Sequence, residues 1–363
     1  MDLIVWLLSL IPILAMWELV RTFGSQIDLG DAISQRVMLF RGYGYLTITL
    51  SLLPPLNAAY YVLCLSRTQA SGIMWLGWGA HVLLSLGVQL LTGSRTSILN
   101  ILLFLVLVSH YCWRRFSLQF YAVLAIGLVV AASFLGTVRN TMKIEGANVD
   151  LRLERAEEIV DNAILSDGLR PLEVLFDSPI RSLQFGMTFL TLFTNPIPRN
   201  WWPGKPDTGG VVYTKVYLED QWDGYSNATP GLLGESMMNF GHAVGLLFGF
   251  GALLGLQFWL GKWYVRLMVL RGRGEFNINY GLSVICFLCA VQFVNGLLTG
   301  EFTNCAVGFL ARVLLILGVG TLWRSRMIGT NQVRERRRFP LTSKPAAAIV
   351  AEERGQEVLR TPT

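Results

Sequence analysis

Arginine, lysine and tryptophan side chains gather in one proline-rich stretch, residues 194–207, which reads Thr-Asn-Pro-Ile-Pro-Arg-Asn-Trp-Trp-Pro-Gly-Lys-Pro-Asp. Its prolines forbid a regular helix or a central strand, because proline lacks an N–H and fixes φ. The stretch therefore predicts a stiff loop that presents Arg199 and Lys205 beside the flat indoles of Trp201 and Trp202. Such a loop suits a phosphate attached to an apolar group, or a sugar ring. The alternative is an interfacial anchor, since these residue types also gather at membrane surfaces.

Further arginines stand in segments that we expect on the same side of the protein as this loop. Arginine binds phosphate oxygens with a bidentate fork and keeps its charge when partly desolvated. Several around one cavity would suit a lipid-linked diphosphate, whose leaving group gains negative charge as a glycosyl bond breaks. The alternative is that they anchor the protein in lipid or pair with acids. The candidates are Arg36, Arg41, Arg95, which lies in a tight Gly-Ser-Arg-Thr-Ser turn, Arg139 and Arg199.

Acid–base chemistry would need a carboxylate or histidine that takes a proton from an attacking sugar hydroxyl. Glu235 is the best candidate, because it follows an Asn-Ala-Thr-Pro-Gly turn just inside a predicted membrane span, where an ordinary helix carries no acid. His242 lies two turns farther along the same predicted helix face, at greater depth. The exposed alternatives are Asp207, Asp220 and Asp223.

Metal chemistry is not predicted. The three histidines stand on different elements, and the motifs H-E-x-x-H and G-x-S-x-G are absent. Cys286 and Cys289 form a C-x-x-C surrounded by apolar residues inside a predicted span, which favours packing over metal binding. His81 is expected to be a core histidine bonded to a neighbour. The other ionisable groups in or beside predicted spans are Glu18, His110, Glu301 and Arg312.

The composition is that of a membrane protein. Hydrophobic residues make up 53% of the 363 residues and charged residues only 15%, far from the soluble average. The apolar runs are long enough to cross a bilayer, which takes about 20 residues. Met1–Val20 lacks a basic n-region and a cleavage site, so we expect a first span and no cleaved signal peptide. The net charge of +6 does not indicate nucleic acid, since the basic residues sit in short loops and the tail.

The sequence thus predicts an all-α polytopic membrane protein with about eight, or more, transmembrane helices. Pro54-Pro55 must kink the second span and leave carbonyls for Asn57 or a neighbouring helix to satisfy. In the sixth span Gly241, Gly245 and Gly249 share one face, so a neighbouring helix can approach closely. The predicted spans are residues 1–20, 44–65, 72–92, 98–113, 118–137, 231–260, 278–299 and 303–323.

These spans divide the chain into four parts, of which a large loop is the most informative. In that loop, residues 151–165 repeat apolar side chains at helical spacing, which predicts a surface helix. Residues 183–193 are too short to span and predict a re-entrant or interfacial helix beside the proline-rich stretch. The parts are N-terminal helices 1–137, an extracytoplasmic loop 138–230, C-terminal helices 231–323 and a basic, disordered tail 324–363.

Basic residues predict the orientation. Arginine and lysine concentrate in the short connections 66–71, 113–117 and 262–275 and in the tail, all of which alternate to one side. Since positive loops stay in the cytoplasm, both termini are expected there, and the proline-rich stretch is expected outside.

Three pieces of the chain occur in a suggestive order: Gly-Ser-Arg-Thr-Ser at 93–97, Pro-Arg-Asn-Trp-Trp-Pro-Gly-Lys-Pro at 198–206, and Thr-Pro-Gly-Leu-Leu-Gly-Glu-Ser-Met-Met-Asn-Phe-Gly at 229–241. Together with the single long outer loop before the late spans, they resemble the O-antigen polymerase (oligosaccharide repeat unit polymerase) family of bacterial glycan assembly. The resemblance covers roughly residues 90–320.

The resemblance implies a metal-independent glycosyltransferase, without a cofactor, in the bacterial cytoplasmic (inner) membrane. Such enzymes move a growing O-antigen, capsule or exopolysaccharide chain from undecaprenyl diphosphate onto the next carrier-linked repeat unit. Expected partners are this donor and acceptor, membrane lipid, and a chain-length regulator or flippase. An O-antigen ligase, which passes the glycan to lipid A core, and a polysaccharide transporter or flippase remain alternatives.

The resemblance also assigns roles to residues. Arg95, Arg199 and Lys205 would grip the diphosphate, and Glu235 would lie near the acceptor. Arg95, Arg199 and Glu235 are the expected catalytic residues. The expected substrate-binding residues are Arg41, Arg139, Trp201, Trp202, Lys205 and His242.

Overall fold

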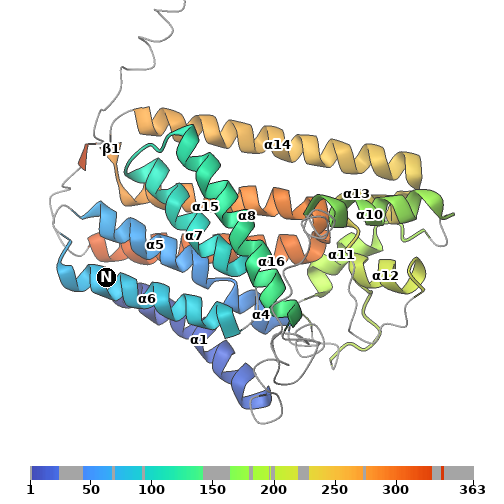
Figure 1. Cartoon of the computed structure of the whole chain (residues 1–363), viewed down its shortest axis with the longest axis horizontal. Helices are drawn as coiled ribbons and strands as arrows, with labels where there is room; N and C mark the ends of the chain where they lie inside the picture. Colours follow the sequence, from blue (N-terminus) through green and yellow to red (C-terminus); the bar gives the residue numbers. More distant parts are fainter. Residues whose placement is uncertain are drawn as a thin grey trace, which may run out of the picture.

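The described part of the chain is almost entirely helical (Figure 1). One two-residue strand pair, β1 (Glu275–Phe276) with β2 (Arg337–Arg338), runs antiparallel and places Glu275 opposite Arg338. The computed structural model describes residues 2–23, 44–67, 70–91, 95–141, 164–179, 183–195, 197, 201–219, 229–272, 275–328 and 337–338.

The long helices follow the predicted apolar runs closely, and four short helices lie between α8 and α14. Their bounds are α1 (Asp2–Phe23), α4 (Gly44–Leu50), α5 (Leu53–Ser66), α6 (Gly72–Leu91), α7 (Arg95–Cys112), α8 (Leu118–Thr141), α10 (Ile164–Asp177), α11 (Met187–Thr194), α12 (Gly209–Val216), α13 (Gly231–Phe240), α14 (His242–Gly272), α15 (Ile278–Thr299) and α16 (Phe302–Ile328).

Six helical segments of the described chain are long and apolar enough to cross a membrane, which makes this a multi-pass membrane protein. Shorter apolar segments lie in α7 (Ile98–Cys112) and α8 (Leu118–Leu128). The prediction of eight spans, like the predicted orientation, stays a prediction. The six segments are Leu3–Thr22, Tyr45–Ser66, Gly72–Leu90, His242–Gly272, Ile278–Thr299 and Phe302–Arg324.

Helices α5 and α15 form the centre of the bundle. Every residue of α5 from Leu53 to Leu65 is buried, and α5 packs against α1, α6, α7, α15 and α16. In contrast, α14 lies along one side of the bundle (Figure 1) and exposes apolar side chains such as Leu247 (77%) and Leu254 (70%). A continuous apolar face of this kind is suited to contact with lipid.

The double proline interrupts the second predicted span, as expected. Helix α4 ends at Leu50, and α5 starts with Pro54 and Pro55 in its first turn. Because Pro54 has no N–H, it cannot bond the carbonyl of Leu50 four residues earlier. The side-chain amide of Gln89 on α6 donates to that carbonyl over 2.9 Å. A neighbouring helix therefore satisfies the freed carbonyl, whereas Asn57 contacts Nδ1 of His81.

The prediction of one continuous span over residues 231–260 is wrong at Gly241. This residue has φ 87° and ψ 166°, a conformation that side-chain-bearing residues rarely adopt, and it separates α13 from α14. Helix α14 then turns back along α13. A Cβ added to Gly245 would lie 2.6 Å from Cα of Met237 on α13. The predicted glycine face therefore does allow a close helix contact, and the neighbour is α13 itself.

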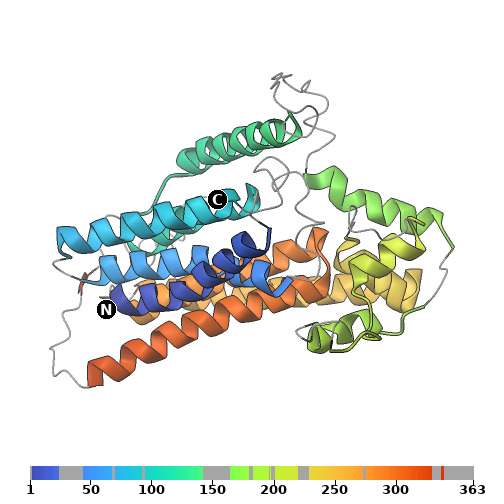
Figure 2. The same cartoon turned by 90° about the horizontal axis from the view of Figure 1, so that it is seen from below.

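Helices α10, α11, α12 and α13 gather at one end of the long helices in both views (Figures 1 and 2). The beginnings of α14 and α16 lie at that end, since α13 packs against both. The short helix α11 occupies most of the predicted run 183–193. The predicted surface helix 151–165 lies outside the described residues except for its last two, which begin α10.

Candidate functional site

Glu235 lies in the middle of α13, and its side chain is fully buried, with 0% exposure. The backbone N–H of Phe302, the first residue of α16, donates to its Oε2 over 2.8 Å. Its Oε1 is enclosed and has no hydrogen-bond partner among the described residues. Neither ion pair in the described part of the chain includes Glu235. The carboxylate is thus held by a helix N-terminus, whose partial positive charge favours an anion.

Glu301 is a second buried acid at the same place, with 1% exposure, immediately before α16. The backbone N–H of Gly210, in the first turn of α12, donates to its Oε2 over 2.7 Å. The side-chain amide of Asn304 donates to its Oε1. Each acid therefore takes an amide from the N-terminus of a helix, Glu235 from α16 and Glu301 from α12.

Helix α12 also contacts Glu235 directly, through Gly209. A Cβ added to Gly209 would lie 2.6 Å from Cδ of the Glu235 carboxyl group, a distance that real Cβ atoms do not show. Glycine is therefore needed at this position for α12 to approach the acid. We refer to Glu235 and Glu301 together as the acid pair.

Hydroxyl and amide groups of α11, α13 and α16 surround the acid pair. The Asn239 amide donates to Oγ1 of Thr188 and to the backbone carbonyl of Glu235, each over 2.7 Å. The Thr191 and Thr303 hydroxyls lie 2.6 Å apart and join α11 to α16. All four polar side chains are buried. This network fixes the helices that carry and enclose the acids.

The environment shifts both acids towards their protonated forms. Burial raises the pKa of Glu235 to about 7, while the Phe302 amide and the Thr188 side chain oppose the rise and the nearby charge of Glu301 adds a smaller increase. Burial also raises the pKa of Glu301, and the bond from the Gly210 amide opposes that shift. A carboxyl group with a pKa near neutrality can exchange a proton at physiological pH.

A general base must come within hydrogen-bond reach of the proton that it accepts. In this structure α12, α16 and the polar network enclose Glu235 on the sides described above. The Oε1 atom of Glu235 is therefore closed to molecules from outside in this structure, and α12, which contacts the carboxyl group at Gly209, is one of the elements that cover it.

The proline-rich stretch connects α11 to α12 and so leads directly to the acid pair. Trp201 and Trp202 are exposed by 82% and 42%. The ammonium group of Lys205 donates to the carbonyls of Ile197 (2.8 Å) and Asn195 (3.3 Å), which closes the base of the loop. Lys205 thus positions the loop, and its predicted contact with a diphosphate stays a prediction.

His242 is not on the helix face of Glu235, in contrast to the prediction. The break at Gly241 makes His242 the first residue of α14. Its Nε2 lies 2.7 Å from the carbonyl oxygen of Leu175, and its ring stacks on Phe176. These contacts join α14 to α10, so the predicted role of His242 in substrate binding stays a prediction.

Of the predicted arginines, Arg95 can be placed by its backbone. It begins α7, which runs antiparallel to α15, because Asn100 contacts Gln292 while Tyr111 contacts Phe287. Arg95 therefore lies towards the end of α15 that leads to Glu301. Arg139 is in the last turn of α8, and Arg36, Arg41 and Arg199 lie outside the described residues, as do Asp220 and Asp223.

Two other buried residues, His81 and Glu301, can be compared with the sequence predictions. His81 contacts Ser9 Oγ at 2.7 Å and the Asn57 side chain, as expected for a core histidine. Glu301 was noted as an ionisable group but was not predicted as a site residue, although an acid in a tight turn between two spans is a signal for one. Among the described residues, no three His, Cys, Asp or Glu side chains are arranged to hold a metal ion.

In comparisons with known proteins, the chain matches no family model, no curated protein and no solved structure. The geometry of the acid pair is therefore the main basis for a functional proposal.

Proposed function

We propose that this protein is a membrane glycosyltransferase that polymerises glycan repeat units carried on undecaprenyl diphosphate. The observation that supports the proposal best is the acid pair. A buried carboxyl group with a pKa of about 7 lies at the end of the proline-rich loop, and that loop exposes two tryptophans. An exposed indole offers a flat face to a sugar ring, and the carboxyl group offers a proton acceptor to its hydroxyl.

In the proposed reaction Glu235 accepts the proton of an acceptor-sugar hydroxyl. The oxygen of that hydroxyl bonds to the anomeric carbon of the donor glycan, and the bond from this carbon to the carrier diphosphate breaks. The diphosphate leaves with the electron pair, and the cations expected near it, Arg95 and Arg199, would stabilise its charge. Glu301 raises the proton affinity of Glu235 by its charge and holds α12 in place.

The direct test is a deletion strain of the source bacterium, whose surface glycan is separated on a gel. The polymerase proposal predicts a single repeat unit attached to its acceptor in place of a ladder. Unattached long polymer would indicate a ligase instead, and the absence of exported glycan would indicate a flippase. Either result would overturn the proposal.

The arginine roles are tested by complementing this strain with Arg95→Ala or Arg199→Ala. Each variant is expected to abolish the ladder while immunoblotting shows the protein in the membrane, because the departing diphosphate loses a cation. Arg324→Ala, near the end of α16, is a matched control that should restore the ladder. Normal ladders from both test variants would rule out the diphosphate clamp.

A further inference from the structure

Asn239 is a fully buried amide one turn after Glu235 on α13, and two backbone groups fix its orientation. Its Oδ1 accepts from the N–H of Gly186 over 2.8 Å, and its Nδ2 donates to the carbonyl of Glu235 over 2.7 Å. A backbone N–H can only donate, and a carbonyl oxygen can only accept. The amide of Asn239 therefore cannot be turned over without the loss of both bonds.

This orientation decides what the hydroxyl of Thr188 can do. The Nδ2 of Asn239 also donates to Oγ1 of Thr188, over 2.7 Å. An amide NH₂ group only donates, so the Thr188 hydroxyl accepts from it and keeps its own proton for another group. Because Thr188 is fully buried, that proton must find its acceptor inside the protein.

The carboxyl group of Glu235 is such an acceptor. The Thr188 side chain acts on it as a hydrogen-bond donor and favours its ionised form, in opposition to burial. Oε2 of Glu235 already accepts from the N–H of Phe302, whereas Oε1 has no hydrogen-bond partner among the described residues. One carboxyl oxygen is thus left for the Thr188 hydroxyl.

The charged groups around Glu235 do not supply a cation in the described part of the chain. Its carboxyl group interacts with Glu301 and with the thiol of Cys305 on α16. Neither α11 nor the rest of α13 carries an ionisable side chain. Ionisable groups on the neighbouring helices have other contacts: Lys215 on α12 pairs with Asp207, and His242 on α14 contacts the carbonyl of Leu175. Among the described side chains, Thr188 is the one that favours the ionised form of Glu235.

We propose that Thr188 and Asn239 are positioning residues that set the proton affinity of Glu235. When Glu235 gives up its proton, the Thr188 hydroxyl donates to the carboxylate, and Asn239 holds that hydroxyl in the donating orientation. This role belongs to the acid pair itself and holds whether or not the protein polymerises glycans.

Helix α16 keeps Thr188 in place for this role. The Thr303 hydroxyl donates to the backbone carbonyl of Thr188 over 3.2 Å, and the Thr191 hydroxyl donates to the same carbonyl. The first turn of α16 therefore fixes Thr188, while its first residue, Phe302, supplies the N–H for Oε2 of Glu235. Donors that are fixed in advance stabilise a charge without reorganisation when it appears.

The test is a titration of Glu235 in the purified full-length protein in detergent, followed by the infrared carbonyl band of protonated carboxyl groups. The part of the band that belongs to Glu235 is the part lost in Glu235→Gln. We expect Thr188→Val to raise the midpoint of this titration by about one pH unit, the scale of a hydrogen bond to a charged group. Asn239→Ala should raise it by less, because the hydroxyl remains but is no longer held.

Two further variants show whether the hydroxyl itself is responsible. Thr188→Ser keeps the hydroxyl and should titrate like the wild type. Thr191→Val removes another buried hydroxyl of α11 and is the matched control, which should also titrate like the wild type. An unchanged midpoint in Thr188→Val would overturn the proposal, and so would an equal rise in Thr191→Val.

Thermal unfolding separates this role from a purely structural one. At pH 5 Glu235 is protonated in the folded wild type and in folded Thr188→Val, so the hydroxyl has no carboxylate to stabilise. At pH 8 the variant has lost that stabilisation, so its Tm deficit relative to the wild type should be larger than at pH 5. An equal deficit at both pH values would show a structural role and contradict the proposal. If Thr188→Val does not fold, the same comparison is made with Asn239→Ala.

The proposed function fails on a different result. A normal ladder from a deletion strain complemented with Glu235→Gln would contradict the general-base role of Glu235. It would leave the effect of Thr188→Val on the titration of Glu235 unchanged.

Discussion

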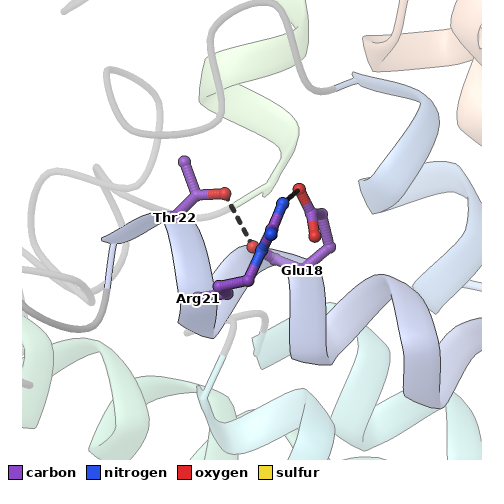
Figure 3. Close-up of polar contacts among 3 residues, drawn as sticks. All are labelled: Glu18, Arg21 and Thr22. Carbon is purple, nitrogen blue, oxygen red and sulfur yellow. Dashed lines mark hydrogen bonds and ion pairs between the residues drawn. The ribbon is translucent and has the colours of Figure 1, made fainter.

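Two kinds of glutamate occur in the part of the chain that the structure describes, and they are held in opposite ways. Glu18, in the last turns of α1, pairs with Arg21 through a 2.8 Å contact between its Oε1 and Nη2, and Thr22 caps its carbonyl (Figure 3). Both charged side chains are well exposed. The acid pair is enclosed and is bound by backbone amides and a neutral side chain.

The difference shows what each arrangement can do. An exposed acid beside a guanidinium contributes little to stability and is easily replaced. A buried acid without a cation ionises only at a cost, so its proton affinity is tuned close to neutrality. Strongly perturbed carboxyl groups concentrate at functional sites, which is why we place the proposed chemistry at the acid pair.

The largest expected effect is on activity. Glu235→Gln keeps the size of the side chain and mimics its protonated form, but it cannot accept a proton. Polymer formation should fall by about 100-fold or more, the range for loss of a general base. The ladder from a complemented deletion strain measures this, with Glu18→Gln as the matched control that should give a normal ladder. Equal ladders from both variants would show that Glu235 is no more important for polymer formation than Glu18, which would contradict its proposed role.

The second expected effect is on the pH dependence of stability. Because the pKa of Glu235 is about 7 when folded and near its ordinary 4.5 when unfolded, the folded state binds more protons between these values. Stability should therefore fall as pH rises from 4.5 to 7, by on the order of 3 kcal/mol from this residue. Glu301 shifts in the same direction.

Apparent Tm values in detergent between pH 5 and pH 8 provide the measurement. Glu235→Gln should flatten the dependence and unfold at a higher temperature than the wild type at pH 8. Glu18→Gln should follow the wild-type curve. A wild-type Tm that rises over this interval would contradict the buried, uncompensated state of the acid pair.

The smallest of the three effects concerns Gly209. A methyl group at this position would overlap the Glu235 carboxyl group, and overpacking of this kind costs about 1–3 kcal/mol. Gly209→Ala should therefore lower the Tm, and the loss should shrink when Glu235→Ala removes the overlapping atoms. A double-mutant cycle on the Tm values checks the coupling. Additive changes in Tm would mean that α12 does not press on Glu235. The control is Gly204→Ala, which should leave the Tm unchanged because Gly204 faces open space.

The long helices could be read from the sequence because each is an apolar run with polar ends, whereas α12 and most of α10 were not predicted. The predicted kink at Pro54-Pro55 was also correct, since a missing N–H acts locally. The break at Gly241 was not predicted, because apolar residues precede and follow this glycine with no proline or polar linker between them. Only the backbone conformation of Gly241 separates them.

The sequence predicted one member of the acid pair and not the other. Glu235 was found because an acid at the start of an apolar run is unusual. Its partner Glu301 was not assigned, because the contact joins residues far apart in the chain, and only the packing of α12, α13 and α16 brings them together. Lys205 was predicted to bind a ligand because it is a basic residue in a loop. In the structure its ammonium group donates to carbonyl groups of its own loop, and ligand binding stays a prediction.

Because the chain reverses at Gly241, the length of α14 can be compared with the thickness of the membrane. Its first turns are fixed against α13, so any excess length must emerge at the other end. The 20 residues from His242 to Gly261 measure about 30 Å, the thickness of the hydrocarbon layer. Lys262 comes next, with its Nζ 4.3 Å from the ring centre of Phe258, and Arg266 and Arg271 follow. The last third of α14 should therefore stand among the lipid head groups of the opposite leaflet and resist any change of register between the helix and the bilayer.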